Sequence, residues 1–323
     1  MARRDRSPAG SAGKKGVQCL SYNTYGDFPV LRKLLTLFLF LLITACSAVQ
    51  PSAPTAGLPR VLAVESFLAD IAQNVAGDRL EVESLLPPGV DAHAYQPVPR
   101  DAAKVADSDV LLVNGAGYET FLAPLLKNAA GQRLLIEASA GLTPERGGDP
   151  HFWLDPTLVI RYVENIRAGL AQADPGGAAV YAANAAAYIE QLKALDGWIV
   201  TQLAQTPPQR RLLVTDHESL GYFAERYGFT VVGTVVPGLS SEAAPSAQQM
   251  AALIERIKSS GAAAIFLNIT DNPQLAEQIA SETGVRVVAD LYIESLSSPD
   301  GPAPTYIEMM KHNVTRIVSA LNP

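Results

Sequence analysis

Residues 263–267 read Ala-Ala-Ile-Phe-Leu, an uninterrupted apolar run. A half-exposed strand would alternate apolar and polar residues, whereas a strand that is apolar throughout needs cover on both faces. Strands of that kind are typical of parallel sheets that carry helices on both sides. The run therefore predicts an α/β fold.

The same alternation of apolar strands and amphipathic helices occurs twice along the chain. In the first half, strands are expected at Val61–Ser66, Leu80–Leu86, Val110–Asn114 and Arg133–Ala138, with helices near 67–76, 97–106 and 118–128. In the second half, strands are expected at Leu212–Thr215, Thr230–Val235, Ala263–Ile269 and Val285–Asp290, with helices near 219–227, 246–259, 273–282 and 304–321. We predict two lobes, each a four-stranded parallel sheet flanked by helices.

An Ala-rich segment joins the two halves. Asp155 and Pro156 predict the cap and first turn of a helix that ends near Asp174. Residues 178–205 then place apolar side chains on recurring faces, which predicts a helix of about 28 residues and about 42 Å. We therefore expect an N-terminal lobe at 60–177, a rigid linking helix at 178–205 and a C-terminal lobe at 206–323, with limited closure between the lobes.

The N-terminal region has the pattern of an export signal. An Arg-Lys pair at 32–33 precedes a ten-residue apolar run at 34–43, in which Thr36 is the one polar residue. Ten residues rise only about 15 Å as a helix, half a bilayer core, so the run is a signal and not a span. Residues 43–46, Ile-Thr-Ala-Cys, resemble a bacterial lipobox and predict acylation of Cys46. The alternative is an ordinary secretory signal with a Cys at its boundary by chance.

This pattern divides the N-terminal residues into a signal region at 1–45 and a lipidated tether at 46–59. Residues 1–29 have no place ahead of such a signal, so we expect translation to begin at Val30. We therefore expect an extracytoplasmic protein that is attached to membrane lipid through Cys46, or a periplasmic one.

Charge and cysteine content limit the range of possible functions. Residues 1–45 contain seven Lys or Arg and two acids, which leaves 18 basic and 30 acidic residues and a net charge of −12 for the rest. A body that acidic is a poor nucleic-acid binder. The chain has two Cys, Cys19 in the signal region and Cys46 at the lipobox, so any metal site in the body must be built from His and carboxylates.

Three of the four His follow predicted strands or lie in the loops between them. In an open α/β sheet, ligands bind beyond the carboxyl ends of the strands. His93 and His151 in the first lobe can therefore face His217 in the second, with Glu294 as a fourth donor. Singly, each loop His is more often structural, but together they would form a three-nitrogen, one-oxygen site for a divalent metal. His312 lies in the last amphipathic helix, and we predict a structural role for it.

Five motifs, in this order, closely resemble the metal-binding lipoproteins of bacterial zinc and manganese ABC importers. They are residues 91–97 (Asp-Ala-His-Ala-Tyr-Gln-Pro), 114–119 (Asn-Gly-Ala-Gly-Tyr-Glu), 149–156 (Asp-Pro-His-Phe-Trp-Leu-Asp-Pro), 217–223 (His-Glu-Ser-Leu-Gly-Tyr-Phe) and 302–310 (Pro-Ala-Pro-Thr-Tyr-Ile-Glu-Met-Met). The resemblance spans residues 60–322. It implies a cluster A-I solute-binding protein that holds Zn²⁺ or Mn²⁺ between its lobes on His93, His151, His217 and Glu294.

The chain departs from this family's pattern at several positions. Ala92 and Gln96 stand where Pro and Glu are usual, and Glu294 stands where Asp is more common. The long His- and acid-rich loop of many zinc-specific members is missing from residues 139–150, which weakens a zinc-only interpretation. Next to the ligands, Asp155 and Asp216 are expected to be supporting residues.

Two classes of function follow from these features. The first is a monomeric binding protein, not an enzyme, that delivers Zn²⁺ or Mn²⁺ to a membrane permease of an ABC transporter. Its ATPase would be a separate subunit, because the chain has no Gly-x-x-x-x-Gly-Lys-Ser/Thr motif. The alternative is a zinc hydrolase with three His and an open position for water. A carboxylate from the opposite lobe would close that position and so distinguishes the two.

Overall fold

The computed structural model describes residues 57–145 and 147–322. The predicted signal region, Cys46 and residues 46–56 of the tether lie outside the described residues. Among the residues that it does describe, no helix is long and apolar enough to cross a membrane.

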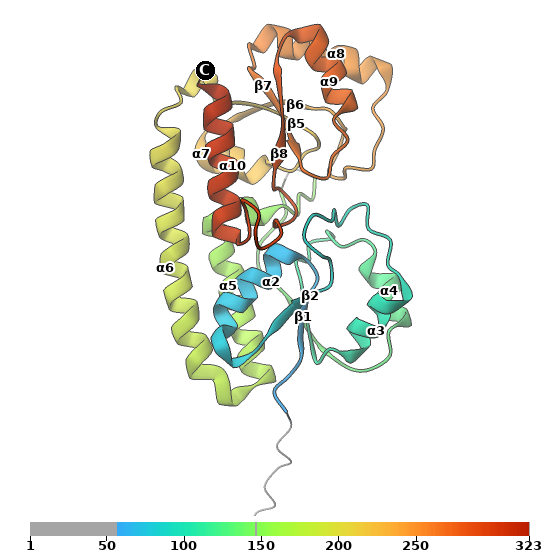
Figure 1. Ribbon diagram of the computed structural model, residues 1–323, viewed down its shortest axis with the longest axis vertical. Coiled ribbons are helices and arrows are strands. Elements are labelled where there is room, and N and C mark those ends of the chain that lie inside the picture. Colours follow the sequence, from blue (N-terminus) through green and yellow to red (C-terminus); the bar gives the residue numbers. More distant parts are fainter. Residues whose placement is uncertain (1–56, 146, 323) are drawn as a thin grey trace, which may run out of the picture. The chain divides into compact units, whose positions relative to one another are not determined.

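Two four-stranded parallel sheets form the centres of two lobes (Figure 1). The first has the order β2-β1-β3-β4, and the second repeats it as β6-β5-β7-β8. The strands are β1 (Val61–Ala63), β2 (Val82–Ser84), β3 (Val110–Val113), β4 (Leu134–Glu137), β5 (Leu212–Thr215), β6 (Thr230–Thr234), β7 (Ala264–Asn268) and β8 (Arg286–Leu291). The predicted two-lobed α/β fold is confirmed.

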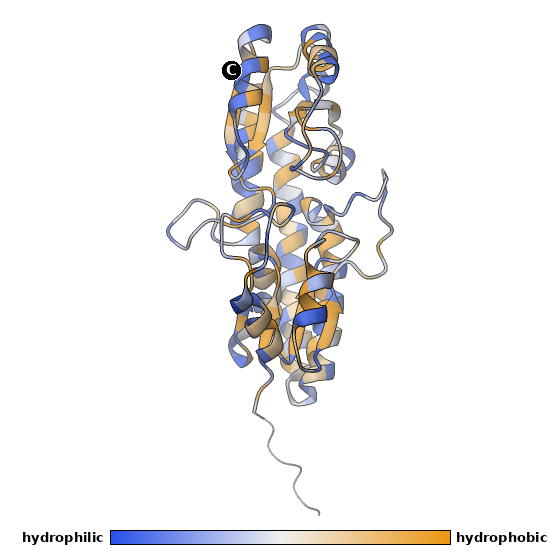
Figure 2. Ribbon diagram, turned by 90° about the vertical axis from the view of Figure 1, so that its right-hand side faces the viewer, coloured by the Kyte–Doolittle hydropathy of each residue, from blue (hydrophilic) through white to orange (hydrophobic). Residues whose placement is uncertain are grey.

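Helices cover these sheets. They are α2 (Ser66–Ala76), α3 (Pro99–Asp107), α4 (Leu122–Asn128), α5 (Pro156–Ala173), α6 (Ala178–Leu203), α7 (Gly221–Tyr227), α8 (Ala247–Ser260), α9 (Gln274–Thr283) and α10 (Tyr306–Leu321). The central strands β3 and β7 are buried at every position, as the apolar residues of β3 and the first four residues of β7 require. Figure 2 shows this contrast, with hydrophobic strands inside and mixed hydrophilic and hydrophobic helices around them.

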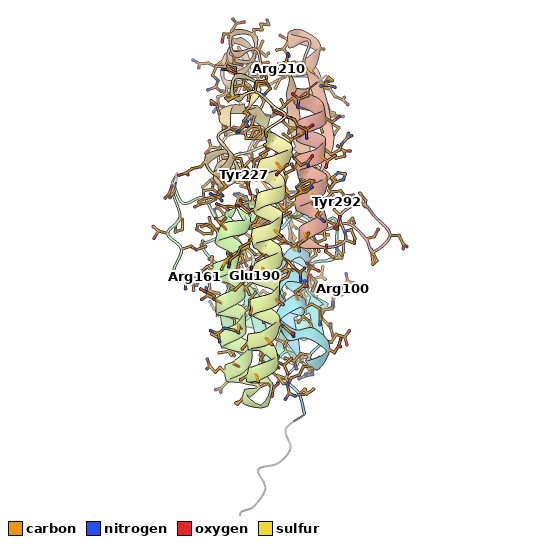
Figure 3. All side chains as sticks on the ribbon, turned by 90° about the vertical axis from the view of Figure 1, so that its left-hand side faces the viewer. Arg100, Arg161, Glu190, Arg210, Tyr227 and Tyr292 are labelled. Atoms are coloured by element: carbon orange, nitrogen blue, oxygen red, sulfur yellow. The ribbon has the colours of Figure 1, made fainter. Side chains whose placement is uncertain are left out.

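The long helix α6 packs against both lobes. It contacts α2 and α5 of the first lobe and α10 of the second, and Figure 3 shows α5 and α10 on either side of it. Its buried side chains include Tyr181, Tyr188 and Leu195, whereas Glu190 marks its exposed face. The helix ends at Leu203, two residues before the predicted end, and Pro207 and Pro208 soon afterwards prevent it from resuming.

Several element boundaries differ from the sequence prediction; the second strand, for example, is Val82–Ser84 and not Leu80–Leu86. Two of the differences follow from particular contacts. The first strand ends at Ala63, because the Glu65 carbonyl already accepts the Ala69 N–H and helix α2 begins at Ser66. The helix expected from 118 begins only at Leu122. Ahead of it, the Glu119 carboxylate accepts the N–H groups of Asn114 (2.5 Å) and Gly115 (3.1 Å), which folds this segment into a turn.

Candidate metal centre

The four predicted donor residues come from the carboxyl ends of strands in both lobes. His93 lies in the loop between β2 and α3, and His151 lies between β4 and α5, just before the short 3-10 helix Phe152–Leu154. His217 and Glu294 follow β5 and β8 of the second lobe. The structure brings all four together, with one donor atom of each within 4.8 Å of the others.

The spacing of these atoms matches a metal coordination sphere. The Nε2 atom of His151 is 3.3 Å from that of His93 and 3.4 Å from that of His217. The Glu294 Oε1 atom lies 3.4 Å, 3.8 Å and 3.1 Å from the Nε2 atoms of His93, His151 and His217. A tetrahedral ion with bonds of about 2.0–2.1 Å would separate its ligand atoms by about 3.3 Å. The residues present therefore fit a four-coordinate divalent ion.

The site is enclosed and negatively polarised. The side chains of His151, His217 and Glu294 are fully buried, and that of His93 is 6% exposed. The Glu294 Oε1 atom makes no well-formed hydrogen bond, although the His217 Nε2 atom lies 3.1 Å away. Although burial alone would raise the pKa of Glu294, the His151 and His217 imidazoles hold it well below its usual value. A buried, ionised carboxylate oxygen that faces three imidazole nitrogens is a group that a bound cation would satisfy.

Two of the imidazoles differ in basicity. Burial lowers the pKa of His93 to about 4, with Glu294 opposing the shift. At His217 burial acts in the same direction, but the carboxylates of Asp216 and Glu294 outweigh it and raise the pKa to about 10. His93 is therefore ready to bind metal at neutral pH, whereas His217 must lose a proton to do so.

Three of the four donor side chains have a polar side chain close to them. The His151 Nδ1 atom is 2.8 Å from the Asp149 Oδ1 atom, and the His217 Nδ1 atom is 3.4 Å from the Asp216 Oδ2 atom. Asn268 donates its Nδ2–H to the second oxygen of Glu294 at 3.2 Å. The contact with Asp149 fixes the ring orientation of His151 and leaves its Nε2 atom toward the centre, whereas the His217 Nδ1 atom makes no hydrogen bond. The contact with Asn268 leaves one Glu294 oxygen, Oε1, as the donor.

Aromatic side chains also pack against two of the donor residues, His93 and His151. The ring of Tyr118 lies edge-on to that of His93, 4.9 Å between centroids, and Trp153 lies 5.1 Å from His151. The Trp153 Nε1–H donates to the Ile293 carbonyl at 2.7 Å, so it joins the first lobe to the residue beside Glu294. Sequence reasoning assigned neither aromatic residue, although both lie in the motifs that it quoted.

The sequence prediction that Asp155 supports the donor residues is wrong. Asp155 caps α5, accepting the N–H of Thr157 at 2.8 Å and its hydroxyl at 2.7 Å. The residue that supports His151 is Asp149, which also accepts the His151 backbone N–H at 3.0 Å. A repeated Asp-x-His pattern was the available signal, because Asp91 accepts the His93 N–H in the same way at 2.7 Å.

This difference between the two aspartates gives a prediction. Asp149→Ala should lower metal affinity about 10- to 100-fold, because His151 loses the group that orients it. Asp155→Ala is the matched control: it removes a helix cap, costs about 1 kcal/mol of stability, and should leave affinity nearly unchanged. Isothermal titration with Zn²⁺ and urea unfolding of both variants measure the two effects. Equal losses of affinity would refute the assignment.

His312 lies away from this cluster. It sits on α10, where its Nε2 atom is 2.9 Å from the Asp290 carbonyl oxygen and its ring contacts Tyr292. These contacts agree with the structural role that the sequence predicted.

Comparison with known proteins identifies the family of this chain. Residues 61–320 match the family described as the periplasmic component A of the zinc-uptake complex, ZnuA. This chain belongs to that family.

The relatives and the solved structure that resemble this chain are named for different metals. The manganese-binding lipoprotein MntA of Halalkalibacterium halodurans is 36% identical over 267 residues, 80% of this chain and 86% of the relative. The metal ABC transporter substrate-binding lipoprotein SsaB of Streptococcus sanguinis is 28% identical over 309 residues, 90% and 99% of the two chains. The solved structure of the periplasmic zinc-binding protein TroA of Treponema pallidum has a TM-score of 0.76 and 28% identity, covering 83% of this chain and 100% of that one.

Proposed function

We propose that this chain captures a divalent transition metal, Zn²⁺ or Mn²⁺, between its lobes on His93, His151, His217 and Glu294, and delivers it to the permease of an ABC importer. The observation that carries the proposal is the convergence of one donor atom from each residue, at distances that suit a tetrahedral ion. Membership of the ZnuA family supports the same function.

The donor set bears on the choice of metal. Three imidazoles and one carboxylate oxygen favour Zn²⁺ over Mn²⁺ in intrinsic affinity. The hydrogen bond from Asn268 to the second Glu294 oxygen supports single-oxygen coordination, and four donors in total suit Zn²⁺. MntA, however, is named for manganese, and availability in the cell can override affinity. Both ions are therefore retained as cargo.

A zinc hydrolase is the competing hypothesis, and the position of Glu294 argues against it. Catalytic zinc sites keep one position open for water. Here the fourth position faces a buried carboxylate from the opposite lobe, 3.1 Å from the His217 Nε2 atom. We therefore infer that the chain is a binding protein and not an enzyme.

Metal binding itself is the first test. The mature protein should bind one Zn²⁺ per chain in isothermal titration and in elemental analysis after dialysis, with Mn²⁺ competing for the same site. Glu294→Gln is the informative variant, because it keeps the side-chain volume but removes the anionic donor, so its affinity should fall sharply. A wild-type protein that binds neither ion, or a Glu294→Gln variant that binds like wild type, would refute the proposal.

We also propose an extracytoplasmic location with lipid attachment through Cys46, and action as a monomer with a permease whose ATPase is a separate subunit. The lipobox-like residues 43–46 support the anchor, and MntA and SsaB are named as lipoproteins.

The anchor gives a further prediction. Cys46→Ser should release the protein from membranes or leave the signal uncleaved, because the acylated thiol is lost. Fractionation and gel mobility of the variant, expressed beside wild type in a bacterial host, measure this. One acyl chain alone would anchor only marginally, so complete membrane retention of wild type requires more than one. Identical fractionation and mobility of the two proteins would show that Cys46 is not the anchor.

A further inference from the structure

Two glutamates of the first lobe, Glu65 and Glu119, lie outside the metal centre and face each other. Glu65 follows β1 and is 1% exposed, and Glu119 lies between β3 and α4. The two strands are neighbours, with Ala63 paired to Leu112. Two residues further on, Glu65 is level with Asn114, whose N–H the Glu119 carboxylate accepts. The strand register thus brings the two side chains into hydrogen-bond contact.

No positive charge accompanies this pair. Within the described residues, neither carboxylate forms an ion pair with Lys, Arg or His. The titratable groups around the pair are the hydroxyls of Tyr118 and of Tyr162 on α5, and the carboxylate of Glu137 on β4 lies beyond them. Two ionised carboxylates in contact and away from water repel each other, so a pair of this kind retains a proton.

The hydrogen bonds indicate which glutamate carries the proton. Glu119 accepts the N–H groups of Asn114 at 2.5 Å and Gly115 at 3.1 Å, as an ionised carboxylate does. Neither oxygen of Glu65 accepts a hydrogen bond, although Glu65 occupies the N-cap position of α2. Burial, together with the charge of Glu119, raises the pKa of Glu65 well above its usual value. A protonated Glu65 can donate to Glu119, whereas an ionised Glu65 would be left without a donor.

A metal cation in place of the proton does not fit this arrangement. Ca²⁺ takes six to eight oxygen ligands, and Mg²⁺ requires a near-ideal octahedron of them. Here the Glu119 oxygens face two backbone N–H groups, whose positive ends would repel a cation. Within the described part of the chain, the one convergent group of three or more His and carboxylate side chains is the metal centre itself.

We propose that Glu65 is a neutral carboxylic acid at pH 7 that donates its O–H to the ionised Glu119, and that this shared proton makes Glu65 a positioning residue for the metal centre. Glu119 holds the turn after β3, and its neighbour Tyr118 packs against the rings of His93 and His151, at 4.9 Å and 5.8 Å between centroids. The shared proton therefore fixes the turn that supports two donor residues. The positioning role rests on the proposed function, whereas the protonation of Glu65 does not.

Infrared spectroscopy tests the protonation directly. At pH 7 without metal, the difference spectrum of wild type minus Glu65→Gln should contain the C=O stretch of a protonated carboxylic acid, because Gln lacks that band. A difference spectrum is needed because burial raises the pKa of Asp271 to about 8, so Asp271 contributes the same band to both proteins. Carboxylate bands without an acid band in this spectrum would overturn the proposal.

Glu137→Gln is the matched control for the infrared experiment. Glu137 is exposed, and it accepts the Ala116 N–H of the same turn at 3.2 Å. The same substitution there removes a glutamate that water solvates, so its difference spectrum should contain carboxylate bands only. An acid band of equal size in both difference spectra would overturn the assignment of the proton to Glu65.

The stability of the metal-free protein gives a pH signature with a fixed sign. Because the folded-state pKa of Glu65 is above its unfolded value of about 4.3, its contribution to stability is complete below about pH 4.3 and is lost as pH rises through the folded-state pKa. Glu65→Gln keeps a donor for Glu119 and does not titrate. The Tm of Glu65→Gln relative to wild type should therefore rise by several degrees from pH 5 to pH 8. A difference that is constant with pH would contradict the shared proton.

Zn²⁺ affinity tests the positioning role. Glu65→Ala removes the donor and should lower affinity about tenfold at pH 7, whereas Glu65→Gln keeps a donor and should stay within about twofold of wild type. Equal losses in the two variants, or no loss in Glu65→Ala, would overturn the positioning role. A wild-type protein that binds no Zn²⁺ would refute the proposed function, while the infrared spectrum would still decide the protonation of Glu65.

Discussion

Replacing His151 by Ala should lower Zn²⁺ affinity by well over the 10- to 100-fold that loss of a supporting residue costs. His151 is central to the cluster, because its Nε2 atom lies within 3.8 Å of the donor atoms of His93, His217 and Glu294. Its removal leaves three donors and a cavity between them. Competition with a chelator of known affinity measures the loss.

His312→Ala is the matched control for this variant. It removes the same side chain from the same protein, but at a position on α10 whose contacts are the Asp290 carbonyl and the Tyr292 ring. Affinity should therefore stay within about twofold of wild type, since no group that touches the site is lost. A titration in which His312 proved essential and His151 dispensable would reverse the assignment.

The second large effect should be on pH dependence. Imidazole must be neutral to bind metal, so protons compete with the ion. The pKa of His217, raised to about 10 by Asp216 and Glu294 against the effect of burial, means that binding near pH 7 releases a proton from this residue. The pKa of His93, lowered to about 4 by burial, adds no competition until strongly acidic pH. Zn²⁺ affinity should therefore fall steadily as pH falls from 8 to 5.

Thermal stability should depend on pH through the same competition between protons and metal, and the direction of the change can be stated. In the metal-free protein, the raised pKa of His217 contributes stability that is complete below about 6.5, its unfolded value, and is lost as pH rises through about 10. Metal binding acts in the opposite direction, because it stabilises the fold most at high pH. The difference in Tm between protein with and without Zn²⁺ should therefore shrink from pH 8 to pH 5. The measurement should use a Zn²⁺ concentration near the dissociation constant. A constant difference there would exclude the three-His site.

The architecture could be predicted from sequence because it depends on patterns that repeat. Continuous apolar runs such as residues 263–267 identify a parallel sheet, and the 3.6-residue pattern of the linking segment identifies α6 almost to its ends. The rule that ligands bind beyond strand ends placed His93, His151, His217 and Glu294 in one region. None of these inferences requires knowledge of an individual side-chain contact.

The details that escaped prediction depend on such contacts. Nothing in the sequence shows that Glu119 folds back onto Asn114 and delays the start of α4, because helix propensity at 118–121 is unremarkable. Likewise, the sequence does not show whether Asp149 or Asp155 contacts His151, because that depends on the direction in which each side chain points. Cross-lobe contacts such as that of Ser241 with Asp91 join residues 150 positions apart, which periodicity cannot reveal.

The division of the donor residues between the lobes also bears on biosynthesis. Their order along the chain is His93, His151, His217 and Glu294, so a growing or truncated polypeptide that ends after α6 carries only the first two. Two imidazoles hold a divalent ion far more weakly than four converged donors. If the proposed site is correct, a chain that has not yet reached Glu294, just past β8, lacks the full set of four donors and should not hold the ion tightly.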